Sequence, residues 1–158
     1  MALLVVDTNV ISLLIKLKGG HAKKDKVKAE WYLDRIQGQD LVRAFPTEGE
    51  LLHWLACTQP GARKQLYEQG VREILDQTGL IDGTPEVSRQ WARIAAEGRA
   101  QGRVHIHDRG HQYREAQLND TWIAACALAH GLPLVSDNAK DFAWMVPALG
   151  LDLISHSS

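Results

Sequence analysis

The chain opens with an apolar run, residues 3–6 (Leu-Leu-Val-Val), that ends abruptly in the acid Asp7. A short apolar run containing Val is typical of a strand buried in a parallel sheet. Two small polar residues follow, and the apolar residues from Val10 to Ile15 then recur at helical spacing. Strand, tight turn and helix open an α/β unit, and ligands bind beyond the carboxyl ends of such strands. Asp7 therefore stands where a site would be built.

The same alternation continues to the end of the chain. Strand-like runs lie at 41–45, 80–82, 134–136 and 151–154, and helix-like segments lie between them. The alanine-rich segment 122–129 is apolar on nearly every side, which predicts a buried helix. No internal repeat, linker or low-complexity segment interrupts the pattern. We therefore predict a single α/β domain over residues 1–158, with a short parallel sheet flanked by helices.

The bulk composition predicts an ordinary globular protein. Eighteen Lys and Arg side chains stand against nineteen Asp and Glu, so net charge predicts neither a nucleic-acid nor a membrane partner. No basic segment precedes the first apolar run, and Asp7 interrupts it, so no signal peptide is expected. No apolar stretch approaches the roughly 20 residues that a spanning helix needs. We expect a cytoplasmic protein without a membrane partner.

Acids stand at the edges of four apolar elements: Asp7, Glu50, Asp120, and the pair Asp137 and Asp141. Most have an ordinary structural explanation. Thr47 and Glu50 have the spacing of a capping box, and an acid such as Asp120 is stabilised at a helix start. Asp137 begins a sequence that favours a turn. Asp7 has the weakest such explanation, because nothing about ending a buried strand requires an acid. We interpret it as the first ligand of a divalent metal.

Taken together, these acids predict one site. If the first and fourth strands are central and parallel, their carboxyl ends lie at one edge of the sheet, and both helix starts can approach it. Carboxylates gathered in one cleft raise each other's pKa unless a cation is present. Oxygen-only ligands select hard ions, so Mg²⁺ or Mn²⁺ is expected rather than zinc. The chemistry that such a site supports is hydrolysis of a phosphodiester bond.

Five short motifs occur in a specific order and spacing. They are Val6-Asp7-Thr8-Asn9, Thr47-x-Gly49-Glu50-Leu51, Asn119-Asp120-x-x-Ile123-Ala124-Ala125, the run from Ala129 to Ser136, and Asn138-x-x-Asp141-Phe142. Together they resemble the PIN-domain family, and most of all the VapC-type toxins of bacterial toxin–antitoxin pairs. The resemblance implies a Rossmann-like PIN fold and a magnesium-dependent endoribonuclease, in which Mn²⁺ can replace Mg²⁺. It also implies an RNA substrate, a partner antitoxin that silences the enzyme, and a homodimer.

The resemblance assigns roles residue by residue. Asp7 and Asp120 would be the direct metal ligands, and Glu50 the third catalytic acid. Thr8 and Asn9, beside the first acid, and Asn138 would position the substrate. The fourth position stays open among three neighbours: Asp141 is favoured, Asp137 follows closely, and Asn138 occupies the place where the family has Asn or Asp.

Two alternatives also stay open. In the polar stretch 104–117, His105, His107, Asp108 and His111 lie close together in sequence. The stretch is interpreted as a polar loop that either contacts the substrate or is only an insertion, with zinc binding as the less favoured reading. The competing function is a PIN-like module that binds RNA or protein with weak or no nuclease activity.

Overall fold

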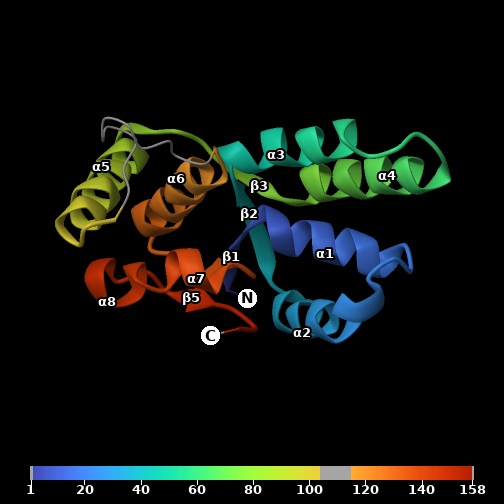
Figure 1. The fold of residues 1–158 in the computed structure, drawn as a ribbon, viewed down its shortest axis with the longest axis horizontal. Helices are drawn as coiled ribbons and strands as arrows, with labels where there is room; N and C mark the ends of the chain where they lie inside the picture. Colours follow the sequence, from blue (N-terminus) through green and yellow to red (C-terminus); the bar gives the residue numbers. More distant parts are fainter. Residues whose placement is uncertain (1, 104–114, 158) are drawn as a thin grey trace.

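The structure is a computed structural model that describes residues 2–103 and 115–157, and of residues 115–117 only the backbone. Its centre is a five-stranded parallel sheet in the order β3-β2-β1-β4-β5 (Figure 1). The strands are β1 (Leu3–Val6), β2 (Asp40–Ala44), β3 (Gly79–Ile81), β4 (Leu134–Val135) and β5 (Leu153–Ile154). The predicted α/β fold with a short parallel sheet is therefore confirmed.

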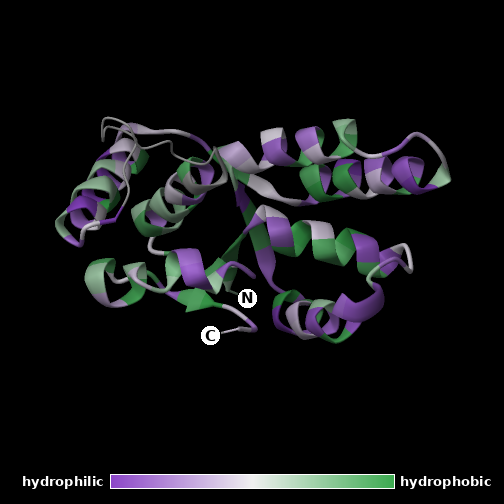
Figure 2. Cartoon of the chain, in the orientation of Figure 1, coloured by the Kyte–Doolittle hydropathy of each residue, from purple (hydrophilic) through white to green (hydrophobic). Residues whose placement is uncertain are grey.

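Helices connect the strands and cover both faces of the sheet (Figure 1). They are α1 (Thr8–Lys18), α2 (Lys26–Ile36), α3 (Phe45–Ala56), α4 (Ala62–Gln77), α5 (Pro85–Ala100), α6 (Glu115–His130), α7 (Ala139–Phe142) and α8 (Met145–Leu149), with a 3-10 turn η1 (Lys23–Asp25) before α2. Figure 2 shows polar and apolar residues alternating along these helices, the pattern of helices that cover a sheet. Within the described residues, no helix is long and apolar enough to cross a membrane.

The sheet separates two hydrophobic cores. Successive side chains of a strand point to opposite faces. Leu4 and Val6 of β1 accordingly join the core formed with α1, α2, α3 and α4. Val5, between them, joins the second core, formed with α5, α6 and the short C-terminal helices. Because both faces of β1 are buried, its sequence is apolar throughout rather than alternating.

The strand order places a switch point beside β1. The chain leaves β1 for β2 on one side and later returns to β4 on the other, where Val5 and Val6 pair with Leu134 and Val135. Connections that leave neighbouring strands in opposite directions open a crevice beyond the strand ends. The residues that follow β1 and β4, Asp7 and Ser136, stand at this crevice.

The structure defines the starts of three helices that bear on the site, and two of them, those of α3 and α6, differ from the prediction. Asp7 itself is the N-cap of α1, and its side chain accepts from the Thr8 amide. Helix α3 begins at Phe45 with Pro46 in its first turn, so the expected start at Thr47 is wrong. Proline is tolerated there because the first amides of a helix have no partner within it. Helix α6 begins at Glu115, several residues before the expected start at Asp120.

Residues 104–114 lie outside the described residues. They include His105, His107, Asp108 and His111, so the predicted substrate-contacting or zinc-binding stretch stays a prediction. Its last three residues, 115–117, belong to the first turn of α6 rather than to a loop.

Gly70 of α4 provides a test of how α1 and α4 pack. A Cβ at Gly70 would lie 2.8 Å from Cγ2 of Ile15, whereas a Cβ at Gly49 of α3 would meet no atom within 4 Å. We expect Gly70→Ala to lower the free energy of unfolding by about 1 kcal/mol, because overpacking outweighs the gain in helix propensity. Gly49→Ala is the matched control and should raise it slightly. Urea unfolding measures both, and equal stabilisation by the two variants would contradict the packing described.

Candidate active site

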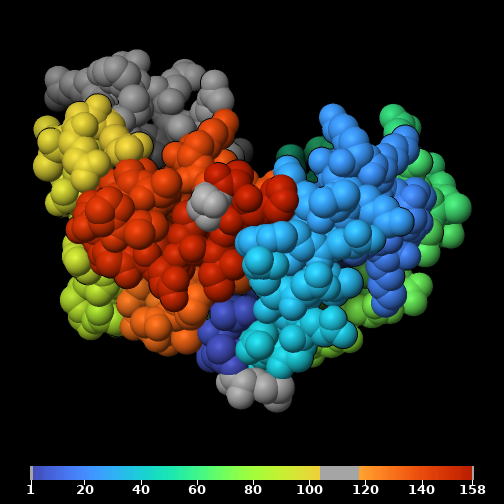
Figure 3. All heavy atoms as spheres, turned by 90° about the horizontal axis from the view of Figure 1, so that it is seen from below, coloured from blue at the N-terminus to red at the C-terminus, as the bar shows by residue number. Residues whose placement is uncertain are grey.

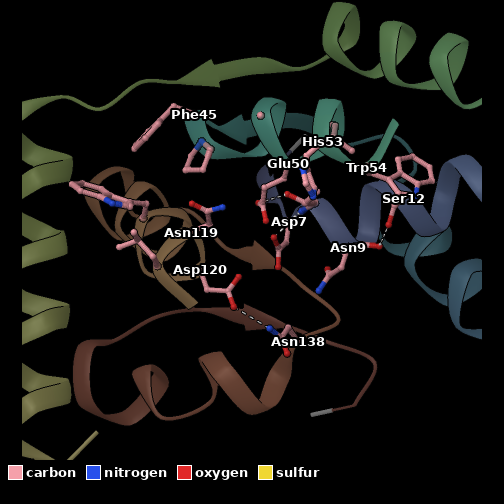
Figure 4. A pocket seen from close by; sticks show the side chains of 16 residues that line it. Asp7, Asn9, Ser12, Phe45, Glu50, His53, Trp54, Asn119, Asp120 and Asn138 are labelled. Atoms are coloured by element: carbon pink, nitrogen blue, oxygen red, sulfur yellow. Dashed lines mark hydrogen bonds between the residues drawn. The ribbon is translucent and has the colours of Figure 1, made fainter. Parts of the chain in front are cut away.

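Three acids from separate elements face one open cavity of about 970 Å³. Asp7 follows β1, whereas Glu50 and Asp120 lie in the second turns of α3 and α6. Figure 4 shows their side chains converging on the cavity, with Asn138 beside Asp120. These three acids lie far apart in the sequence and are brought together by the fold. The predicted gathering of acids at the β1 and β4 edge is seen for these three.

Asp7 is buried, with 3% of its surface exposed. Its Oδ1 accepts from the Thr8 amide and its Oδ2 from Ser136 Oγ, each at 2.7 Å. Burial raises the pKa of Asp7 to about 6, and the charge of Glu50 adds to the rise, while both hydrogen bonds oppose it. Hydrogen bonds to both oxygens thus fix the orientation of the Asp7 carboxylate. Both donors are neutral, so they do not balance its negative charge.

Glu50 is held by Thr8, whose Oγ1 donates to Glu50 Oε1 at 2.8 Å. Burial raises the pKa of Glu50, and hydrogen bonds from Thr8 and Asn119 lower it in part. Thr47 lies inside the first turn of α3, and the N-cap is Ala44. The capping-box explanation of Glu50 is therefore wrong, which leaves this acid without a structural role of that kind.

Of the three acids, Asp120 has the most strongly raised pKa. Burial raises its pKa to about 8, with further increases from the charges of Asp7, Asp141 and Glu50. Asn138 opposes this rise, because its Nδ2 donates to Asp120 Oδ2 at 3.0 Å. The same amide donates to Asp141 Oδ2 at 2.6 Å. Asn138 thus bridges two acids.

The three neighbours at the fourth position have different surroundings. Asn138 lines the cavity, and Asp141 lies behind it as its hydrogen-bond partner. The carboxylate of Asp137 lies instead between Lys28 Nζ at 3.0 Å and the Tyr32 hydroxyl at 2.8 Å, both on α2. The structure therefore brings Asn138 to the cavity and engages Asp137 elsewhere.

The charge balance of the cavity favours a cation. Of the residues that the structure describes, no Lys or Arg lines the cavity, although three acids do. Within the same residues, no three Asp, Glu, His or Cys side chains are close enough to form a complete metal cage. Mg²⁺ does not need such a cage, because it keeps several waters and takes one or two carboxylates. The buried oxygen donors Asp7 and Asp120 fit a hard divalent ion of this kind.

Several cavity residues were not predicted from the sequence. Phe45, Trp54 and Trp122 line its walls, and His53 lies beside Trp54 on α3. Ser136 was interpreted only as the end of a strand, yet it donates to Asp7. Its position directly after β4, opposite the residue that follows β1, is the signal that would have identified it.

The sequence matches a known protein family and a known ribonuclease. The PIN domain family model matches residues 4–144. Ribonuclease VapC5 of Mycobacterium tuberculosis is 32% identical over 69 residues. That match covers 44% of this chain and 42% of the relative, so the chain spans less than half the length of the relative that it matches.

Several solved structures with the same fold are VapBC structures. VapBC2 from Rickettsia felis, bound to a promoter DNA fragment, has a TM-score of 0.69 and 17% identity, over 97% of this chain and 98% of the other. VapBC-1 from nontypeable Haemophilus influenzae has a TM-score of 0.67 and 20% identity, over 99% of both chains. VapBC-5 from Mycobacterium tuberculosis has a TM-score of 0.67 and 22% identity, over 98% and 99%.

The fold of these structures extends over nearly the whole of this chain, and the family model includes the three acids of the cavity. The resemblance found in the sequence motifs is therefore confirmed, and this chain belongs to the PIN domain family.

Proposed function

We propose that this chain is a metal-dependent endoribonuclease that hydrolyses RNA phosphodiester bonds as the toxin of a toxin–antitoxin pair. The observation that carries the proposal is the cavity itself, where the buried Asp7 and Asp120 and the partly buried Glu50 meet without a Lys or Arg among the described residues that line it. The partial match to a protein named Ribonuclease VapC5 and the fold shared with VapBC structures support the same reading.

Each cavity residue has a role in this proposal. Asp7 and Asp120 hold the Mg²⁺ or Mn²⁺ ion, which when bound supplies Lewis-acid polarisation of the phosphodiester. Ser136 and Asn138 orient these two carboxylates by donating to them. Glu50 accepts a proton from the attacking water, since its raised pKa brings it closer to neutral pH.

Two residues beside the acids position the substrate. Thr8 donates to Glu50, and Asn9 lines the cavity while its Oδ1 accepts from the Asp137 amide at 3.2 Å. Asp141 does not line the cavity. It accepts a hydrogen bond from Asn138, which does, and its negative charge lies close to the site. We assign Asp137 to the support of this region rather than to the metal.

The aromatic wall of the cavity fits an RNA with unpaired bases. Trp122 stacks on Trp91 with ring centroids 5.0 Å apart and planes at 16°, and it meets Phe45 edge to face at 5.6 Å. Trp122 therefore packs between two aromatic neighbours. Unpaired RNA bases stack on aromatic side chains, so aromatic residues in the same cavity as the acids support RNA as the substrate.

The partner in this proposal is an antitoxin protein, as in the VapBC structures that share the fold. The homodimer expected from the sequence stays a prediction. Light scattering on the isolated chain should give about twice the monomer mass of 17.6 kDa, and a monomeric mass at all concentrations would contradict it.

Asp7→Asn tests the catalytic assignment. The substitution keeps the size of the side chain and one of its two acceptor oxygens, replaces the other oxygen by an NH2 donor, and removes the charge that holds the ion. We expect RNA cleavage with Mg²⁺ to fall by about 100-fold or more, as in the loss of a direct participant. Growth arrest on expression of the chain should disappear in the same variant. Glu73→Gln, at a surface salt bridge with Lys18, is the control and should cleave like wild type.

The opposite outcomes identify which part fails. If Asp7→Asn cleaves as fast as wild type, the active-site assignment is wrong. If the folded wild type cleaves no RNA with Mg²⁺ or Mn²⁺, the competing function of an RNA- or protein-binding module is favoured.

The pH dependence of stability tests the electrostatics of the metal-free site. The pKa of Asp120 is about 8 in the folded protein against 3.8 as the reference value. The folded state therefore binds this proton more tightly, so the free energy of unfolding falls as pH rises between these two values. The decrease is at most about 1.4 kcal/mol per pH unit for one proton.

Asp120→Asn should remove most of that decrease, and Mg²⁺ should stabilise wild type more at pH 8 than at pH 5. Thermal unfolding with and without Mg²⁺ measures both effects. An identical pH profile for wild type and Asp120→Asn would contradict the raised pKa.

A further inference from the structure

The turn after β4 contacts the site through alternate residues. We call residues 136–138 the site turn. Its first residue, Ser136, donates to Asp7 Oδ2 at 2.7 Å, and its last, Asn138, donates to Asp120 Oδ2 at 3.0 Å. The two ends are also joined, since the Asn138 amide donates to Ser136 Oγ at 3.0 Å. The two carboxylates that the proposed function assigns to the metal, Asp7 and Asp120, are therefore oriented by one short segment.

The middle residue of the site turn faces away from the cavity. The carboxylate of Asp137 contacts Lys28 Nζ at 3.0 Å and the Tyr32 hydroxyl at 2.8 Å. Both partners lie on α2, a helix that contributes no residue to the cavity lining. The site turn is thus held from behind by a helix far from it in sequence.

Tyr32 is the buried centre of this contact, with none of its surface exposed. Its hydroxyl also lies 3.1 Å from the carbonyl oxygen of Ser136 and accepts from the His156 amide at 3.0 Å. Figure 3 shows the C-terminal residues in red lying against α2 in blue, consistent with this bond. One hydroxyl therefore ties α2, the site turn and the end of the chain together.

The ion pair has an electrostatic consequence as well. Lys28 and Asp137 keep 33% and 17% of their side-chain surface exposed, so the pair is partly shielded from water. Breaking such a pair leaves an uncompensated charge, here a fourth carboxylate next to a cavity that already holds three. Lys28 therefore holds the site turn and also balances the charge of Asp137.

We propose that Lys28 and Tyr32 are positioning residues, which act through Asp137 to hold Ser136 and Asn138 where they orient the metal-binding carboxylates. This inference rests on the proposed function, because it presumes that Asp7 and Asp120 bind a divalent ion. It assigns to Asp137 the role of an anchor rather than of a metal ligand.

Mn²⁺ binding in the absence of RNA tests the proposal without an activity assay. Titration calorimetry is applied to wild type, Lys28→Gln, Asp137→Asn, the double variant of these two, and Lys28→Arg. Lys26→Gln is the matched control, since Lys26 lies on the same helix in an exposed pair with Glu30. Thermal unfolding of each variant verifies that it is folded.

We expect Lys28→Gln and Asp137→Asn each to weaken Mn²⁺ binding by about tenfold, the scale of losses when a supporting contact of a metal ligand is removed. The double variant should be no weaker than either single one, because both break the same contact. Lys28→Arg should restore binding, and Lys26→Gln should bind like wild type.

Three results would overturn the proposal. If Asp137→Asn weakens binding while Lys28→Gln does not, Asp137 acts at the metal itself. If both variants bind like wild type, the contact does not position the site. If the folded wild type binds no Mn²⁺, the metal site of the proposed function fails and the positioning role fails with it.

Discussion

Repulsion among buried carboxylates is the constraint on which the rest of this site depends. Burial, with a smaller contribution from the charge of Glu50, raises the pKa of Asp7 to about 6. Burial and the charges of the neighbouring acids raise the pKa of Asp120 to about 8. The fold must supply the stability that this arrangement costs, and it does so with two apolar cores on either side of one strand. The hydrogen bonds to these acids come from neutral donors, Ser136, Asn138 and Thr8. Neutral donors orient carboxylates without balancing their negative charge.

The topology explains why the acids meet at this point. Asp7 follows the central strand β1, beside the position where the chain order reverses between β2 and β4. It caps α1 and faces the cavity with the same carboxylate, so local helix capping and the site share one side chain. This double use explains why an acid at the end of a buried strand is compatible with a stable α/β unit.

The sequence predicted the sheet, most strand positions and three acids of the cavity, because these follow from apolar periodicity and from residues at strand ends. It did not predict the start of α6, whose apolar character on nearly every side gives no helical face to locate the first turn. It also left Asp137, Asn138 and Asp141 open. Residues in a tight turn differ in direction by backbone geometry, and sequence spacing does not determine which one points to the cavity. Only the partners of Asp137 on α2 decide its direction.

The distance between the acids depends on how two separate layers meet. Glu50 is anchored next to Leu51, which is fully buried in the core of α1 to α4, and Asp120 lies on the helix that buries Ile123 in the other core. The helices α3 and α6 touch directly where Phe45 meets Trp122. That aromatic contact lies in the cavity wall, so residues that join α3 and α6 are also those to which the proposed function assigns base stacking. In the proposed function, a base stacked there would press on a contact between α3 and α6, and so on the elements that carry Glu50 and Asp120.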